Sequence, residues 1–333
     1  MKSRRSGRLP LVVMLLFTVF GSTLVFSPAP ASAAIGCGST ITSSTTLSAD
    51  IGPCEGNGLT ISASFVTLDC AGHTITGAPY NGVGINLTGV VHVRVMNCNV
   101  VGFDDGFYLA PSTHNNQLSG NTANGNAFGI YLDTASNNNV LSGNTADDNA
   151  VSGFILYTSS GNQMTGNIAN GNGQNGVLIV YSGNDNSMSG NTANGNGQFG
   201  VYLLFSNDHC DLVANTANGN TYGGFAFFGS NKCSLNRNTA NGNGMWGIVA
   251  QNSTNMRVID NVANGNLVYG FYMLFSGNSE LKSNTANSNG QYGYFDRSSG
   301  SGTRGTANTY TGDECSLNGF GGSSPAGLGS PQS

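Results

Sequence analysis

Two groups of acidic residues are the side chains in this sequence best suited to catalysis. Asp104 and Asp105 are adjacent, and a glycosidase uses a pair of carboxylates as acid and base or nucleophile. Asp208, His209 and Asp211 form the second group, which could bind a metal ion or transfer protons. Both groups also have a structural interpretation, because the first replaces Asn and Gly in a turn and the second fits a solvated loop. These five residues are therefore candidates and not an assigned catalytic site.

A series of aromatic residues, separated by whole repeats of the chain, is the second kind of candidate. They alternate with apolar residues predicted to face inward, so we expect their rings to face outward. Exposed rings could stack on the sugars of an extended polysaccharide, while nearby Asn and Thr side chains bind the sugar oxygens. The same rings would also suit packing across a sheet, or an apolar stripe covered by a partner chain. The candidate carbohydrate-binding residues are Tyr108, Tyr131, Tyr202, Tyr272 and Phe295.

An eightfold repeat sets the spacing of these residues. The motif Asn-(Thr/Ile/Val)-Ala-(Asn/Asp)-(Gly/Asp/Ser)-Asn recurs in steps of 23 or 24 residues. A fixed period of this size indicates one supersecondary unit that stacks on copies of itself. Each copy carries a short segment with the alternating pattern of a strand, and no helical spacing persists beyond residue 33. The motifs begin at Asn121, Asn144, Asn167, Asn191, Asn215, Asn238, Asn261 and Asn284.

The repeat predicts an all-β fold, a single-stranded parallel β-helix of about ten coils of 23–24 residues each. Strands this short bury a face only when equivalent coils stack about 4.8 Å apart. Propeller blades need about 40 residues per repeat, and the Leu-x-x-Leu-x-Leu spacing of leucine-rich repeats does not occur. An inward Asn amide can hydrogen-bond to the coils above and below, both at the motif position and five residues before it. We therefore interpret the eight motif Asn residues as a structural ladder.

The first coils are similar to those of a known family. Segments 65–75 (FVTLDCAGHTI), 84–87 (GINL) and 93–98 (VRVMNC) resemble secreted right-handed β-helix repeat proteins, the pectin-lyase-like and NosD-like group. The right hand of the helix is implied by this resemblance alone. The group includes lyases, hydrolases, epimerases and binding proteins, so the resemblance implies a fold more than a function. Pectin-hydrolysing relatives carry Gly-His-Gly and Arg-x-Lys segments, and neither occurs here.

The NosD-like resemblance also suggests copper delivery, which needs Met, His or Cys side chains gathered at a surface. Met164 and Met188 occupy inward positions of the repeat, so they are predicted to belong to the core. No Cys-x-x-Cys pair or His/Cys cluster suggests zinc. The sequence therefore predicts neither a metal site nor a cofactor.

The chain is expected to divide into five parts. Residues 1–33 fit a signal peptide, with a basic start, an apolar segment at 11–26 and a small-residue cleavage site at 31–33. No membrane span is expected after cleavage, because no other segment approaches the necessary length. Residues 34–58 are predicted to form an N-terminal cap and 59–296 the coils. Residues 297–318 are predicted to be irregular, and 319–333 to be a flexible tail.

The charge distribution excludes one class of partner. Of the 11 Lys and Arg residues, four precede residue 34, which leaves a net charge of 7 − 16 = −9 on the predicted mature chain. No Lys or Arg lies between Val95 and Asn231. A nucleic-acid surface needs a basic stripe, so nucleic acid is not an expected partner. A polyuronate lyase is also disfavoured over these coils, since it needs cations to neutralise the substrate; Lys232, Arg237 and Arg257 leave it open further on.

Seven cysteines in an exported chain favour disulfide bonds. One candidate pair flanks the segment before the first coil, and a second lies in adjacent early coils. The third pair lies five residues before two successive motif Asn residues, where stacking allows either a disulfide or two buried thiols. The candidate pairs are Cys37 with Cys54, Cys70 with Cys98, and Cys210 with Cys233.

Cys315 is left without a partner in this assignment. Chains that resemble this one often close their last coil with a second cysteine near the end. Gly329 stands where that cysteine is expected.

The leading hypothesis is a secreted, monomeric protein that binds a polysaccharide or a cell-surface glycan through the outward aromatic row, without catalysis. The alternative is a polysaccharide hydrolase, lyase or epimerase that uses Asp104 and Asp105, or the loop with Asp208, His209 and Asp211. A structural or adhesive role at the surface is the third hypothesis. The sequence does not identify the glycan.

Overall fold

The computed structural model describes residues 35–181, 183–205 and 207–330. The predicted signal peptide, residues 1–33, lies outside the described residues. Within the described part, every regular element is a β-strand except one 3₁₀ turn, Thr303–Gly305. In this part no helix is long and apolar enough to cross a membrane.

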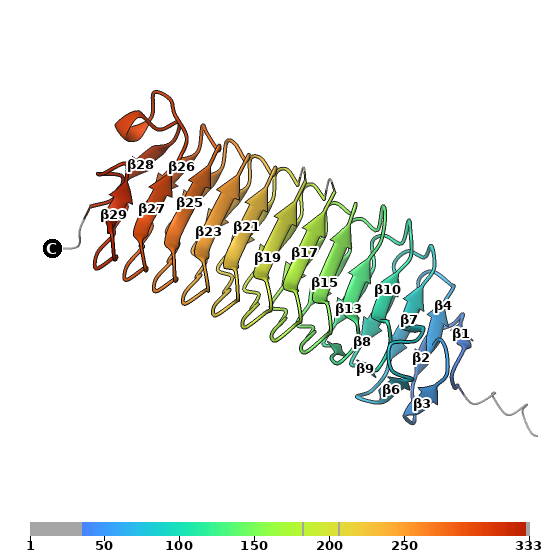
Figure 1. Cartoon of the computed structure of the whole chain (residues 1–333). Helices are drawn as coiled ribbons and strands as arrows, with labels where there is room; N and C mark the ends of the chain where they lie inside the picture. The colour runs from blue at the N-terminus through green and yellow to red at the C-terminus, as the bar shows by residue number, and fades with distance from the viewer. Residues whose placement is uncertain (1–34, 182, 206, 331–333) are drawn as a thin grey trace, which may run out of the picture. The chain divides into compact units, whose positions relative to one another are not determined.

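One parallel sheet of 13 strands runs through the whole described unit. Each of its strands comes from a different coil, and Figure 1 shows them side by side in chain order from β1 to β29. The strands are β1 (Ser39–Ile41), β4 (Leu59–Ile61), β7 (Val83–Leu87), β10 (Asp105–Leu109), β13 (Phe128–Leu132), β15 (Ser152–Tyr157), β17 (Asn175–Val180), β19 (Phe199–Leu204), β21 (Gly223–Phe228), β23 (Trp246–Gln251), β25 (Tyr269–Leu274), β27 (Tyr292–Asp296) and β29 (Gly321–Ser324).

A second parallel sheet of 12 strands forms another side of the same coils. Its strands are β2 (Thr45–Thr46), β5 (Thr67–Asp69), β8 (Arg94–Met96), β11 (Gln117–Ser119), β14 (Val140–Ser142), β16 (Gln163–Thr165), β18 (Ser187–Ser189), β20 (Asp211–Val213), β22 (Ser234–Asn236), β24 (Arg257–Ile259), β26 (Glu280–Lys282) and β28 (Thr309–Thr311).

The third side of the coils begins as a four-stranded sheet and continues as single bridges. The four strands are β3 (Ile51–Cys54), β6 (Thr74–Gly77), β9 (Asn99–Val101) and β12 (Thr122–Ala123). From Thr122 onward, one residue per coil bridges to the next coil as far as Ser330. Because all three sides pair in parallel with successive coils, the structure confirms the predicted parallel β-helix.

The stack of coils is longer at both ends than the predicted range of 59–296. At the N-terminal end β1 pairs with β4, so the predicted cap supplies strands to the sheets. At the C-terminal end β28 pairs with β26 and β29 pairs with β27. The last coil escaped the repeat pattern because Asp313 replaces the motif Asn and lies 29 residues after Asn284.

The motif Asn residues form a continuous hydrogen-bond ladder inside the coils. The Nδ2 of Asn191 donates to Oδ1 of Asn215 at 2.9 Å and to the carbonyl oxygen of Met164 at 2.9 Å. Its own Oδ1 accepts hydrogen bonds from the backbone and side-chain nitrogens of Asn167. The ladder ends at Asp313, whose Oδ1 accepts both nitrogens of Asn284.

Two further Asn columns accompany this ladder. The column five residues before the motif contains Asn116, Asn139, Asn162 and Asn186, which are hydrogen-bonded coil to coil. A third column lies in the Asn-Gly-Asn segments that the sequence predicts to be turns. The structure shows that this column is fully buried and equally continuous. Its members are the last Asn of each motif: Asn126, Asn149, Asn172, Asn196, Asn220, Asn243, Asn266 and Asn289.

The structure contains all three candidate disulfides. Cys37 is bonded to Cys54, Cys70 to Cys98, and Cys210 to Cys233, with Cα separations of 5.5, 4.7 and 4.5 Å. The third bond lies in the column of Asn116 and Asn186, on two coils where cysteines replace the amides of that column. It links these neighbouring coils covalently, and the side-chain hydrogen bonds of the column resume at Ser279 and Asn308.

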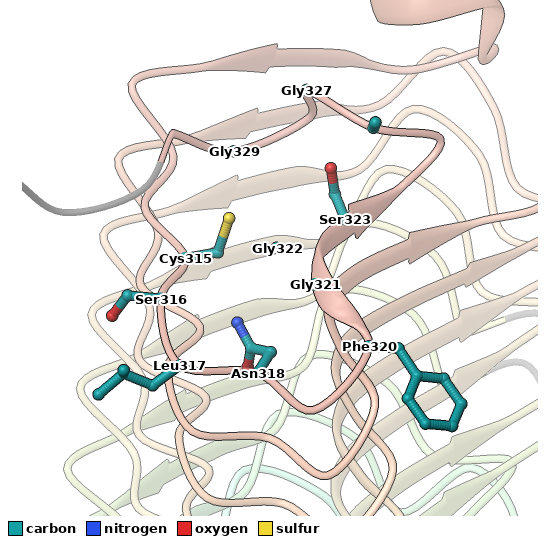
Figure 2. Close-up of a pocket in the computed structure, with 11 residues that line it drawn as sticks. Cys315, Ser316, Leu317, Asn318, Phe320, Gly321, Gly322, Ser323, Gly327 and Gly329 are labelled. Atoms are coloured by element: carbon teal, nitrogen blue, oxygen red, sulfur yellow. The ribbon is translucent and has the colours of Figure 1, made fainter.

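The last coil leaves a hollow of about 470 Å³ at the end of the stack. Cys315 is the free cysteine of the described residues, and its side chain points into this hollow toward Gly322 and Gly329 (Figure 2). A Cβ atom added to Gly329 would lie 2.9 Å from the Cys315 sulfur. This is close to the separation between the Cβ of one cysteine and the sulfur of its partner in a disulfide.

The ladder predicts that Asn191→Ala destabilises the protein more than Asn194→Ala does. Asn191→Ala leaves both nitrogens of Asn167 and the carbonyl of Met164 without this hydrogen-bond partner. The side chain of Asn194 accepts one hydrogen bond, from the backbone nitrogen of Asn218, so Asn194→Ala removes less. We expect a loss of about 3 kcal/mol for Asn191→Ala and about 1 kcal/mol for Asn194→Ala. Urea unfolding measures both, and equal losses would contradict the ladder.

The end hollow predicts that Gly329→Cys forms a disulfide with Cys315 under oxidising conditions. Thiol titration of the unfolded variant should then find no free thiol, and reduction should lower the thermal midpoint. The gain in stability is expected to be less than about 3 kcal/mol, because the added Cβ also lies 2.9 Å from the ring of Tyr294. Two titratable thiols in the oxidised variant would contradict the prediction.

Candidate functional site

The outward surface of the 13-stranded sheet is the candidate functional site. Its central column places one residue of each coil in direct register with the next. All five predicted carbohydrate-binding residues belong to this column, and all are partly exposed. In order the column reads Tyr108, Tyr131, Ile155, Leu178, Tyr202, Ala226, Val249, Tyr272 and Phe295.

A second column of aromatic residues lies beside it, and the sequence reasoning missed it. These residues begin the strands, directly before the Gly that opens each apolar segment, and they are also in register. An aromatic residue directly before that Gly is the sequence pattern that would have predicted this column. The column includes Phe128, Phe199, Trp246, Tyr269 and Tyr292.

The two columns pack against each other and make one outward aromatic surface. Ring centroids lie 4.8 Å apart for Phe199 and Tyr202, and 4.5 Å apart for Tyr269 and Phe295. Phe199, Ala226 and Val249 form a small buried cluster separate from the main core. The surface is therefore partly packing, as the alternative hypothesis held, while the rings of Tyr202 and Tyr272 stay partly exposed.

Asp105 occupies the second column at the N-terminal end of this surface, next to Phe128 in register. Its Oδ1 is buried and has no hydrogen-bond partner among the described residues. Burial, followed by the charges of Asp104 and Asp133, raises the pKa of the Asp105 carboxyl to about 7. Asp105 is therefore partly protonated near pH 7, in contrast to an ordinary aspartate.

Asp133 directly follows β13, and its pKa is shifted in the opposite direction to that of Asp105. Burial raises its pKa, but hydrogen bonds from the Tyr108 hydroxyl and from the backbone and side chain of Thr134 outweigh burial and leave the pKa lowered. Tyr131 lies against Tyr108, with ring centroids 5.6 Å apart. Burial, followed by the Asp133 charge, raises the pKa of Tyr131 to about 12. A protonated and an ionised carboxyl thus lie beside two neutral tyrosines.

The other candidate catalytic residues lie elsewhere. Asp104 is exposed and precedes β10. Asp208 is part of a turn ladder, since its Oδ1 accepts the backbone and side-chain nitrogens of Asn231. His209 is exposed, and Asp211 is exposed on β20 of the 12-stranded sheet. The structure therefore does not bring Asp208, His209 and Asp211 together with Asp105.

The residues of the NosD-like and metal hypotheses are also placed by the structure. Met164 and Met188 are buried and stack in register between β16 and β18. In residues 35–181, 183–205 and 207–330, no group of three or more His, Cys, Asp or Glu side chains could hold a metal ion.

Two family models match the sequence. A model described as "Right handed beta helix region" matches residues 57–217. A model described as "Periplasmic copper-binding protein (NosD)" matches residues 203–324. Comparison with curated proteins finds no match.

Several solved structures resemble the fold. The A-module of the mannuronan C-5 epimerase AlgE6 of Azotobacter vinelandii is 18% identical with a TM-score of 0.60, over 80% of this chain and 88% of that one. The Dettilon tailspike protein is 15% identical with a TM-score of 0.56, over 82% and 58%. The catalytic unit of an alpha-1,3-glucanase from Streptomyces thermodiastaticus is 11% identical with a TM-score of 0.53, over 89% and 60%. At these identities the similarity shows the fold alone.

The environment of Asp105 predicts a pH-dependent effect of Asp105→Asn on stability. A carboxyl whose pKa is raised from its ordinary value of 3.8 to about 7 on folding stabilises the protein fully below pH 4, and this contribution is lost as the pH rises to about 7. Asp105→Asn should therefore gain stability relative to the wild type between pH 4 and pH 8, by on the order of 2 kcal/mol. Thermal unfolding across this range measures the difference.

Asp104→Asn is the matched control, because it removes an adjacent carboxylate that is exposed. Its effect on stability should vary much less with pH. A pH-independent difference between Asp105→Asn and the wild type would show that Asp105 is an ordinary carboxylate.

Proposed function

Because the chain is a right-handed parallel β-helix repeat protein of the pectin-lyase-like and NosD-like group, we propose that the outward face of its 13-stranded sheet binds an extended polysaccharide. The observation that carries this proposal is the register of one outward column from Tyr108 to Phe295, which places aromatic rings at five of its nine positions. One position per coil remains in register over nine strands, β10 to β27, so the surface repeats along its length as a polymer does.

The chemistry of the surface suits sugars. Aromatic rings offer flat apolar area, and their hydroxyl or indole groups bind polar partners at the edge. Tyr131, Tyr202 and Tyr272 combine both properties at partly exposed positions. A polysaccharide presents ring CH groups and hydroxyls together, so one chain could use both along the face.

The structural neighbours support a polysaccharide as the ligand class. One is an epimerase of mannuronan and another is an alpha-1,3-glucanase. Both share this fold with the chain over 80% or more of its length. For the copper-binding description of the second family model, the stacked methionines Met164 and Met188 offer no surface ligands, since both are buried.

We place the site of action outside the cytoplasm. Three disulfides are typical of proteins that fold in an oxidising compartment. The signal peptide expected at residues 1–33 is consistent with this location. A monomer remains the expected oligomeric state.

Cleavage of the polysaccharide is a second candidate function, favoured by the buried, unpartnered carboxyl oxygen of Asp105 at one end of the aromatic column. In this function Asp105, whose pKa is raised to about 7, donates a proton to the glycosidic oxygen. Release of reducing ends that survives Asp208→Asn but not Asp105→Asn would assign the proton donor to Asp105. Binding without release of reducing ends would leave the first function.

The binding function predicts that Tyr131→Ala combined with Tyr202→Ala abolishes retention of the protein on its glycan. Both substitutions remove partly exposed rings, so the thermal midpoint should change by only a few degrees. Native electrophoresis through gels cast with single polysaccharides measures retention, and staining of the gel for polymer reveals any cleared track.

Tyr80→Ala is the control, because Tyr80 is exposed but lies outside the 13-stranded sheet. It should leave retention unchanged. Full retention of the double variant would contradict binding by the aromatic row, and lack of retention of the wild type on every polysaccharide would favour a structural or protein-binding role.

A further inference from the structure

One turn position after the 13-stranded sheet has a left-handed backbone in six successive coils. The residue there lies two positions beyond the last inward residue of the strand. In Tyr181 and Phe205 the backbone nitrogen donates to the next coil, to the carbonyls of Leu204 at 3.1 Å and Phe228 at 2.9 Å. The six residues and their φ angles are Thr158 (48°), Tyr181 (60°), Phe205 (63°), Gly229 (67°), Asn252 (50°) and Phe275 (51°).

The residue types at this position differ in how well they tolerate that backbone. Gly229 adopts a positive φ without steric cost, and Asn252 is the next best choice. A bulky residue at positive φ is a local strain, because its Cβ approaches the adjacent carbonyl oxygen. Tyr181 and Phe205 therefore cost stability at a position that other coils fill with favourable residues.

Packing against the core does not explain these two aromatic residues. Tyr181 is 47% exposed and Phe205 is 50% exposed. Their rings stack on each other with centroids 5.4 Å apart, and Tyr181 also contacts Tyr157 at 5.6 Å. The three rings thus make an open aromatic strip along three adjacent coils, at the edge of the face described above.

The charge around the strip limits what can lie on it. No Lys or Arg occurs between Val95 and Asn231, which includes every coil of the strip. The charged residues that follow in the same turns are acidic, Asp185 and Asp208. On the three coils of the strip a polyanion would meet these carboxylates, and the first cation of the same turn, Lys232, lies one coil further on. Uncharged sugar rings would meet flat apolar surface.

We propose that Tyr157, Tyr181 and Phe205 form a second stacking strip that binds an uncharged glycan chain at the edge of the 13-stranded sheet. This inference rests on the proposed polysaccharide binding and extends it to a ligand class and to residues outside the central row.

The test replaces Tyr181 and Phe205 by Asn, the residue found at the same turn position in another coil. Tyr181→Asn and Phe205→Asn copy Asn252, so the thermal midpoint of each variant should equal or exceed that of the wild type. Retention in gels cast with galactomannan, xylan or β-1,3-glucan should weaken by about tenfold for each ring removed. Retention in alginate or polygalacturonate gels should be absent for the wild type.

Phe275→Asn is the matched control. Phe275 has the same turn position and a similar φ of 51°, but Gly229 and Asn252 separate it from the strip. It should raise the thermal midpoint in the same way and leave retention unchanged.

The outcomes separate this inference from the function on which it rests. Retention that is lost in Tyr202→Ala but unchanged in Phe205→Asn would overturn the strip and keep the central row. Retention on polyuronates, or on the polycation chitosan alone, would overturn the uncharged ligand class. Lack of retention of the wild type on every polymer would overturn both proposals.

Discussion

Hydrogen bonds that run from one coil to the next support every part of this fold. Strands of two to six residues cannot bury a face alone, so the backbone along all three sides pairs with the neighbouring coil. Inside the coils, each ladder amide satisfies both the backbone and the side chain of the previous coil, as Asn191 does for Asn167. Each buried Asn is therefore tolerated because its neighbours are Asn as well.

The repeat in the sequence determines this much of the fold because a ladder needs the same residue at the same step. The alternating apolar pairs and the motif Asn therefore predicted the parallel coils. The end of the stack was harder to predict, since Asp313 ends the ladder after an insertion that includes Thr303–Gly305. The buried Asn column from Asn126 to Asn289 was also missed, because Asn beside Gly reads as a turn until the next coil covers it.

The candidate site was predictable only where it follows the repeat. The row from Tyr108 to Phe295 occupies one repeat position, so counting residues found it. The raised pKa of Asp105 depends on burial and on the charges of Asp104 and of Asp133 from the next coil, and burial and the approach of Asp133 arise only in the fold. The left-handed backbone at Tyr181 and Phe205 could not be predicted from residue type, because it is a property of the turn.

The ladder also has consequences for how the length of this protein can change in evolution. Within the ladder, the side-chain amide of each internal Asn donates to the Asn of the next coil and accepts from the Asn of the previous coil. One internal coil can therefore take the place of another without changing this pattern. Tandem duplication or deletion of a unit would preserve every interior bond and would lengthen or shorten the outward face by one row. Asp313 is different, since an ionised carboxylate accepts hydrogen bonds but has none to donate. New coils are therefore expected to be inserted between Asn121 and Asn284. The length of the outward face is then set by the number of coils that the gene encodes.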